Sequence, residues 1–297
     1  MMIETLKLAL PHGISLSCRA SGPADAPRLL LLHGFPEGAF IWDELLQTLG
    51  RRWRCIAPDL RGYGESSAPA EVSAYRAKHL VADLVALIEQ TGTGPLDALI
   101  AHDWGGAVAW NLAVQRPELM QRLVIINSPH PGTFLHALQH DAAQQAASEY
   151  MNFFCRPDAE ALLAANDYAR LWPFFNGPDG SAPWLDEALR QRYRAQWAHG
   201  LTGPLNYYRA SPMRPATSAD PAAAALSFAP EFVTVTLPTL VIWGEQDHAL
   251  LPVLLDGLER FVPQLRLARV SDAGHWIVHQ QPSRVASLIE GFVRAGL

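Results

Sequence analysis

The chain has 297 residues, of which 49% are hydrophobic and 18% charged, and its 23 basic and 29 acidic residues give a formal net charge of −6. This composition supports a large buried core and excludes an intrinsically disordered chain. Because Lys and Arg are scattered and form no basic stripe, we expect neither a nucleic-acid partner nor binding to a membrane.

The N-terminal segment, the lengths of the apolar runs and the cysteines argue against further classes of protein. The opening MMIETLKLALPHG lacks the basic and apolar regions of a signal peptide, and no apolar run approaches the ~20 residues of a membrane span. The three cysteines are widely spaced and form no CxxC pair, which argues against a disulfide framework and a zinc ribbon. We expect a cytoplasmic protein that is a monomer or a homodimer.

The first 131 residues alternate apolar and amphipathic segments, after an edge hairpin formed by ETLKLAL and GISLSCRA. Near-continuous apolar runs are typical of strands that are covered on both faces, and alternation of strands and helices predicts a parallel sheet. The predicted strands are Arg28–Gly34, Arg54–Leu60, Leu96–Asp103 and Arg122–Pro129. The predicted helices are Ile41–Leu49, Arg76–Gln90 and Gly105–Gln115.

The alternation stops at residue 132 and returns at 233. Residues 132–232 read as irregular helices and hold 15 of the 27 aromatic residues, which favours both a packed core and a lid over an apolar pocket. Strands at Pro238–Asp247 and Gln264–Val270 follow, with helices near Val253–Phe261 and Arg284–Ala295. The sequence therefore predicts one core from residues 1–131 and 233–297, with a helical cap, or lid, inserted at 132–232.

The segment ALIAHDWGGAVAW places Asp103 at a strand-to-helix turn between small residues. A strand, a nucleophile between small residues and then a helix form the nucleophile elbow, which exposes one side chain at the carboxyl edge of the sheet. An aspartate is also a favoured helix N-cap, so the elbow alone leaves both interpretations of Asp103 open.

The partners of a nucleophile occur in the chain order expected for hydrolases that carry a nucleophile elbow. Asp247 follows the strand LVIWG, and His275 follows the last strand, which matches the order nucleophile, acid, histidine. LLHGFPEG follows the third predicted strand, so the backbone N–H groups of Phe35 and Trp104 are candidates for an oxyanion hole.

Together, HGFPE, DLRGYGESSAP and HDWGG resemble the epoxide hydrolases of the α/β-hydrolase fold, over essentially the whole chain. The resemblance implies this fold, with a mostly parallel sheet flanked by helices and an inserted cap. LTGPLNYYRA is similar to the cap segment in which a tyrosine, here Tyr208, donates a hydrogen bond to the epoxide oxygen. SEYMNFFCRP resembles the segment of the second such tyrosine, which implies Tyr150, with Tyr168 as the alternative.

The chemistry of an aspartate suits this reaction. A carboxylate can open an epoxide by forming an alkyl ester, which water then cleaves with help from a base, here His275 oriented by Asp247. The resemblance implies a small hydrophobic epoxide and water as partners, with Trp104, Phe35, Pro36 and Phe154 in the substrate pocket. We expect no metal and no cofactor, since the sequence shows no ligand cluster, GxGxxG or P-loop.

Two other functions remain open. A haloalkane or haloacid dehalogenase uses the same Asp–His–Asp set, but Phe35 cannot supply the side-chain donor that often follows HG, and HDWGGA lacks the arginines of fluoroacetate enzymes. A binding protein that has kept a hydrolase scaffold would be expected to have lost one of these residues. We expect His33 and His102 to be structural, Asp59 and Arg61 to pair or to cap within a tight loop, and His248 and His279 to lie at the surface.

Overall fold

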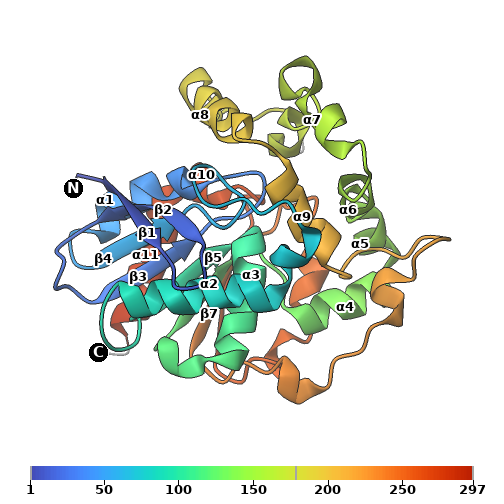
Figure 1. The fold of residues 1–297 in the computed structure, drawn as a ribbon. Coiled ribbons are helices and arrows are strands. Elements are labelled where there is room, and N and C mark those ends of the chain that lie inside the picture. Colours follow the sequence, from blue (N-terminus) through green and yellow to red (C-terminus); the bar gives the residue numbers. More distant parts are fainter. Residues whose placement is uncertain (1, 178, 296–297) are drawn as a thin grey trace.

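The computed structural model describes residues 2–177 and 179–295 (Figure 1). Its centre is an eight-stranded sheet with the strand order β1-β2-β4-β3-β5-β6-β7-β8. β1 and β2 pair antiparallel, as do β2 and β4, and the remaining pairs are parallel. The strands are β1 Glu4–Ala9, β2 Ser15–Ser21, β3 Arg28–Leu32, β4 Arg54–Pro58, β5 Ala98–His102, β6 Leu123–Ile126, β7 Thr239–Gly244 and β8 Leu265–Val270.

The predicted N-terminal hairpin and the parallel sheet are both confirmed, and the strand order positions the functional residues. Every residue of β3, β5, β6 and β7 is buried, as expected for strands covered on both faces. After β3 the chain runs outward to β4 and then returns to place β5 on the other side of β3. This reversal is a topological switch point, and ligands of open α/β sheets bind beyond the carboxyl ends of the strands there.

Helices cover both faces of the sheet (Figure 1). α1 packs against α11 and α2 packs against α3, so each face carries one pair of contacting helices. Their bounds are α1 Asp43–Leu49, α2 Ala77–Gln90, α3 Asp103–Gln115 and α11 Pro282–Arg294, with the short α10 Ile277–Gln280 before the last. The architecture is the α/β-hydrolase fold that the sequence predicts.

The chain between β6 and β7 is mainly helical and gathers beyond one end of the sheet, with α7 and α8 at the top of Figure 1. Its helices are α4 Pro131–His140, α5 Ala142–Ala147, α6 Tyr150–Phe154, α7 Ala159–Tyr168, α8 Glu187–Ala198 and α9 Thr202–Ala210. We call this segment the helical insertion. Its division from the core at residues 132 and 232 stays a prediction.

Two local expectations are wrong. Residues 253–261 do not form one helix but two 3₁₀ turns, Pro252–Leu255 and Leu258–Arg260, because Gly257 between them adopts a left-handed φ of 75°. Of the two alternatives for Asp59 and Arg61, pairing with each other is wrong, because Arg61 has another partner. It donates two hydrogen bonds of 2.7 and 2.6 Å to the buried carboxylate of Asp83, while Asp59 accepts from the backbone N–H of Ala39.

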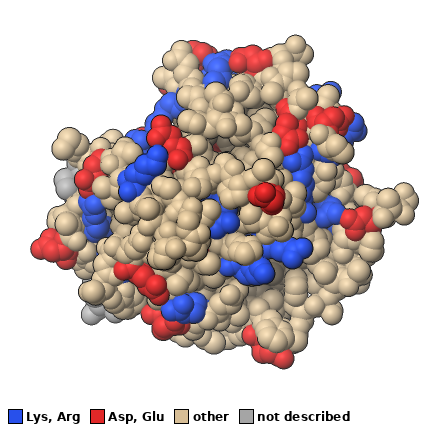
Figure 2. Space-filling view, in the orientation of Figure 1, with Lys and Arg blue, Asp and Glu red and all other residues tan. Residues whose placement is uncertain are grey.

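Acidic and basic side chains alternate over the face shown in Figure 2, without a large region of one sign. Among the described residues, no helix combines the length and the apolar character that crossing a membrane requires.

Candidate active site

The sharp turn from β5 into α3 carries Asp103. Its φ of 49° lies in the left-handed region, which residues with a side chain rarely adopt, although Asp and Asn do so more readily than the others. The turn is possible only because neighbouring positions lack side chains. A Cβ at Gly34 would lie 2.2 Å from the Asp103 carboxylate, and one at Gly105 would lie 2.5 Å from the carbonyl oxygen of His33. The sequence therefore folds a strained elbow that presents one carboxylate.

The carboxylate of Asp103 does not cap its helix. Its Oδ1 accepts a hydrogen bond of 2.6 Å from the backbone N–H of Phe35, which follows β3 across the switch point. The N–H of Trp104 belongs to the first turn of α3, where backbone N–H groups have no acceptor within the helix. Of the two predicted oxyanion donors, Phe35 therefore contacts the carboxylate, and Trp104 directly follows Asp103 in the first turn of the helix.

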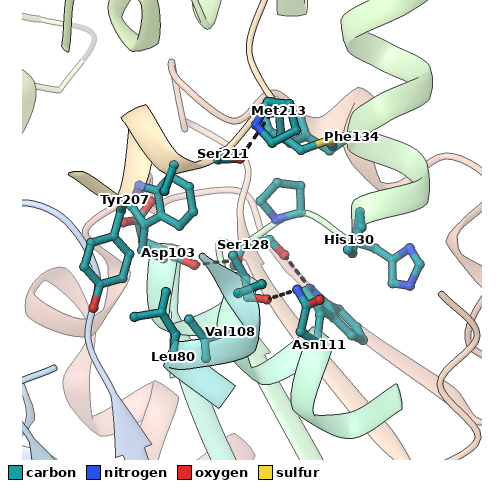
Figure 3. Close-up of a pocket in the computed structure, with 18 of the residues that line it drawn as sticks. Leu80, Asp103, Val108, Asn111, Ser128, His130, Phe134, Tyr207, Ser211 and Met213 are labelled. Carbon is teal, nitrogen blue, oxygen red and sulfur yellow. Dashed lines mark hydrogen bonds between the residues drawn. The ribbon is translucent and has the colours of Figure 1, made fainter. Parts of the chain in front are cut away.

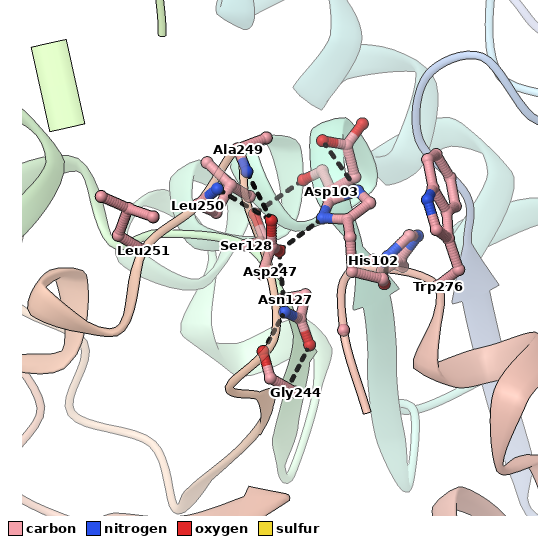
Figure 4. Close-up of polar contacts among 12 residues, drawn as sticks. His102, Asp103, Asn127, Ser128, Gly244, Asp247, Ala249, Leu250, Leu251 and Trp276 are labelled. Carbon is pink, nitrogen blue, oxygen red and sulfur yellow. Dashed lines mark hydrogen bonds and ion pairs between the residues drawn. The ribbon is translucent and has the colours of Figure 1, made fainter. Parts of the chain in front are cut away.

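Asp247 and Asp103 lie near each other at the same edge of the sheet (Figure 4), and His275 lies close to both. Nδ1 of His275 lies 2.7 Å from Oδ2 of Asp247, and its Nε2 lies 3.8 Å from Oδ2 of Asp103. The imidazole therefore faces Asp103 with one nitrogen and a buried acid with the other, although the three residues come from three separate loops.

Asp247 is fully enclosed and held by several donors. The backbone N–H groups of Ala249 and Leu250 donate to its Oδ1, each at 2.9 Å, and the side chain of Asn127 donates to its Oδ2 at 2.9 Å (Figure 4). Burial by itself raises the pKa of Asp247, but the charge and hydrogen bond of His275, together with these donors, hold the pKa below its ordinary value. Asp247 is therefore ionised at neutral pH.

The two carboxylates raise the pKa of His275 to about 9. Burial lowers this pKa, but the charge of Asp247, its hydrogen bond and the charge of Asp103 outweigh burial. With both carboxylates ionised, the imidazole is protonated at neutral pH.

Two tyrosines of the helical insertion approach Asp103. Tyr150 and Tyr208 both line a cavity with Asp103 and His275, and their ring centroids are 6.1 Å apart. Tyr168, the alternative to Tyr150, packs on Trp197 instead. Phe154 is fully buried and lies behind the site, with its ring against those of Tyr150 and Tyr208.

Both phenols are held in the neutral form. Burial raises the pKa of Tyr150 well above its ordinary value, and the charge of Asp103 adds to the shift. Burial, Tyr150 and Asp103 do the same for the pKa of Tyr208. Each side chain therefore keeps an O–H group that can donate a hydrogen bond next to the carboxylate.

Two chambers meet at Asp103 and Tyr150, which line both of them. The larger, of about 440 Å³, extends along α3 past Val108 and Phe134 (Figure 3). The smaller, of about 290 Å³, lies on the side of His275 and includes Phe35, Pro36 and Tyr208 among its lining residues. Trp104 lines the larger one. Of the predicted pocket residues, Trp104, Phe35 and Pro36 thus border a chamber, whereas Phe154 borders neither.

A buried polar cluster near the site was not predicted. Oε1 of Glu37 accepts a hydrogen bond of 2.6 Å from Tyr193 and lies 2.9 Å from Nε2 of His279, while His102 lies 3.3 Å from Oε2. Burial raises the pKa of Glu37, but the His102 and His279 rings hold it well below its ordinary value. His279 therefore does not lie at the surface, contrary to the expectation from the sequence. His102 and His33 are buried and hydrogen-bonded, and His248 is exposed, as expected.

Only the position of Glu37, two residues after Phe35, pointed to this cluster, because Tyr193 and His279 come from distant elements. Within residues 2–177 and 179–295, no group of three or more His, Cys, Asp and Glu side chains is arranged to hold a metal ion.

Comparison with known proteins defines the class. A family model described as the alpha/beta hydrolase fold matches residues 27–282. The chain therefore belongs to this family and is a hydrolase of the α/β-hydrolase superfamily.

The similar proteins within this superfamily include several epoxide hydrolases. The chain is 33% identical to epoxide hydrolase 4 of Mus musculus, over 95% of this chain and 77% of that protein. It is 37% identical to the AB hydrolase superfamily protein YfhM of Bacillus subtilis, over 95% and 96%. The structure of a mutant epoxide hydrolase from Bacillus megaterium superposes with a TM-score of 0.88 at 29% identity, over 97% of this chain and 100% of that one. The predicted resemblance to epoxide hydrolases is confirmed.

Proposed function

We propose that the protein hydrolyses hydrophobic epoxides to vicinal diols through a covalent ester on Asp103. The observation that carries this proposal is the grouping of a carboxylate nucleophile, an acid-bound imidazole and two neutral phenols around one cavity. The similarity to epoxide hydrolases supports the same reaction.

The first step opens the ring. A carboxylate oxygen of Asp103 attacks one ring carbon, the carbon–oxygen bond breaks, and the epoxide oxygen leaves as an alkoxide. An alkoxide is a poor leaving group, so Tyr150 and Tyr208 donate hydrogen bonds to it and supply the proton. Acid assistance of this kind contributes typically about 10²–10⁴-fold to the rate. The product of this step is an alkyl ester of Asp103 with a neighbouring hydroxyl.

The second step cleaves the ester. Nε2 of His275 removes a proton from water, the resulting hydroxide adds to the ester carbonyl, and the N–H groups of Phe35 and Trp104 stabilise the oxyanion. Loss of one such donor costs about 10²–10³ in rate in well-studied hydrolases. Collapse of this intermediate breaks the bond between the acyl carbon and the substrate-bound oxygen, and the hydroxyl proton of the intermediate passes to the departing alkoxide. The diol therefore carries one oxygen of the Asp103 carboxylate, and the oxygen of the water molecule replaces it in the restored carboxylate.

The charges order the two steps. In the free enzyme the negative Asp103 helps to keep His275 protonated, with its pKa near 9. Ester formation neutralises Asp103, which lowers the pKa of the imidazole. The imidazole then releases its proton, an equal proton restores the tyrosine that protonated the alkoxide, and the neutral His275 can act as a base. Formation of the Asp103 ester therefore also produces the neutral imidazole that is needed to hydrolyse this ester.

Intact mass spectrometry of His275→Gln tests the proposal directly. Without its base the enzyme stalls at the ester, so incubation with an aryl epoxide is expected to add the mass of the whole epoxide. Asp103→Asn, whose side chain has nearly the same size, serves as the matched control and is expected to gain nothing.

The same assay with a chloroalkane separates the dehalogenase alternative. An adduct that forms only from the chloroalkane, and that is lighter than the added compound by HCl, would assign the protein to the dehalogenases. No adduct from a broad panel of epoxides would contradict epoxide hydrolysis.

A further inference from the structure

The two chambers that meet at Asp103 differ in chemistry as well as in size. Apolar side chains dominate the larger, including Leu80, Val108 and Phe134. The smaller is mixed. Apolar side chains such as Phe174 and Trp276 line it together with the imidazole and carboxylate of the proposed base and its acid and the polar side chains of Gln246, His248, Asn176 and Gln280. A symmetric ligand therefore does not fit this site equally well on both sides of Asp103.

The openings of the chambers show the same contrast. Phe228 and Phe232 line the larger chamber and are 39% and 73% exposed, so this chamber reaches the surface between aromatic rings. The exposed residues that line the smaller chamber are mainly polar: Asn176, Gln246 and His248, with Pro173 beside them. An apolar group gains most by entering through the first opening, and water gains most by entering through the second.

We infer that the preferred substrates are epoxides with one bulky apolar substituent, which occupies the larger chamber, while the smaller chamber takes the unsubstituted end of the ring and the attacking water. This inference rests on the proposed epoxide hydrolysis and specifies its substrate class.

The volume of the larger chamber fits such a substituent. An apolar protein cavity of about 150 Å³ binds benzene, and the larger chamber measures about 440 Å³. It therefore has room for one aryl group with a linker or a second ring. The few polar groups there are mostly engaged with the protein. Both ring nitrogens of His130 have backbone partners, and the hydroxyl of Ser128 donates to the backbone of Asp103 (Figure 3).

Size alone does not exclude an aryl group from the smaller chamber, but the polar side chains in its lining disfavour one. An apolar substituent there would displace water from polar side chains without replacing their hydrogen bonds, which is costly. It would also occupy the space beside Nε2 of His275 from which the attacking water must come. Substrates with two bulky substituents, one on each ring carbon, are therefore expected to react poorly.

The test compares three epoxides on the purified protein: styrene oxide, trans-stilbene oxide and propylene oxide. We expect kcat/KM for styrene oxide to exceed that for trans-stilbene oxide at least about tenfold, which is within the range that pocket contacts produce. Equal values for the two aryl epoxides would overturn the inference. If none of the three is hydrolysed, the proposed function fails and the inference fails with it.

Two matched substitutions assign the substituent to a chamber. Ala107 and Ala147 are both half-buried alanines, and Ala107 lines only the larger chamber whereas Ala147 lines only the smaller. Ala107→Phe is expected to lower the ratio of kcat/KM for styrene oxide to that for propylene oxide by about tenfold. Ala147→Phe is expected to leave this ratio within about twofold of that of the unmodified protein.

The reverse pattern, in which only Ala147→Phe lowers the ratio, would overturn the inference. Turnover of propylene oxide serves as the check that each variant is folded. If Ala107→Phe does not turn over propylene oxide, the smaller change Ala107→Leu takes its place, and an unchanged ratio in that variant would equally contradict the assignment.

Discussion

Replacing Asp103 by Asn removes a negative charge that lies 3.8 Å from Nε2 of His275, with little change in side-chain size. Two unit charges at about this distance interact by about 1 kcal/mol in water and about 4 kcal/mol at an effective dielectric constant near 20. Since about 1.4 kcal/mol corresponds to one pH unit, the pKa of His275 should fall by about one to three units. Starting from about 9, the variant should titrate between about 6 and 8.

The measurement is an NMR titration of the His275 ring in the two proteins, with His275→Gln used to assign the signal. Asp272→Asn is the matched control, because it removes the same charge three residues from His275 at a side chain that is 69% exposed. Solvent screens that charge, so the control should leave the pKa of His275 nearly unchanged. A fall of less than about 0.3 unit in Asp103→Asn would refute the argument that Asp103 helps to keep the imidazole charged.

In the proposed mechanism, the fall in the pKa of His275 on loss of the Asp103 charge has a kinetic consequence. Hydrolysis of the ester needs a neutral His275, so its rate should fall as the pH drops below the lowered pKa of the imidazole. Ring opening needs an ionised Asp103 and no base, so its rate should not follow this titration. Rapid-quench measurements of ester formation and ester decay separate the two pH profiles. They cover pH 5 to 9, which extends on both sides of the pKa of about 6 to 8 expected for the imidazole.

Two further predictions concern the groups around this pair. Tyr150→Phe and Tyr208→Phe should each slow ester formation by about tenfold or more, because each removes one donor to the epoxide oxygen. The double variant should be slower by about 10²–10⁴-fold. Unchanged single-turnover rates would rule out both tyrosines as acids. Asn127→Ala should lower the free energy of unfolding by about 2–3 kcal/mol, since it removes buried hydrogen bonds to Asp247 and Gly244. Urea unfolding measures this loss, and a change below about 0.5 kcal/mol would show that these bonds contribute little.

The sequence predicts those parts of the site that follow from the parallel sheet. Asp103, Asp247 and His275 each come just after a strand, and the carboxyl ends of parallel strands share one edge. Their meeting therefore needs only the strand assignments and the chain order. Phe35 is predictable for the same reason, because it follows β3, the neighbour of β5.

Other contacts leave no periodic signal in the sequence. Glu37 and His279 are 242 residues apart, and Glu37 and Tyr193 are 156 apart. Each residue taken alone is compatible with a surface position, and only the docking of the helical insertion on the core makes them a buried cluster. The two chambers are equally hidden, because their shapes depend on which side-chain rotamers fill the space between α3 and the insertion.

The contacts that dock the helical insertion lie next to the residues proposed to act in the reaction. The indole N–H of Trp197 donates to the carbonyl oxygen of Pro36 at 2.7 Å. The indole N–H of Trp276 donates to the carbonyl oxygen of Phe174 at 2.9 Å. Tyr207 donates to a backbone carbonyl of the core, that of residue 61, at 2.8 Å.

Each of these three hydrogen bonds involves a residue that is next in sequence to one proposed to act in the reaction. Pro36 follows Phe35, the proposed oxyanion donor, Trp276 follows His275, the proposed base, and Tyr207 precedes Tyr208, a proposed acid. A displacement of the insertion would therefore move donor, base and acid relative to Asp103 at the same time. Catalytic geometry tolerates only small displacements of this kind. If the proposed mechanism holds, the insertion therefore sets the distances around Asp103 as well as lining the chambers.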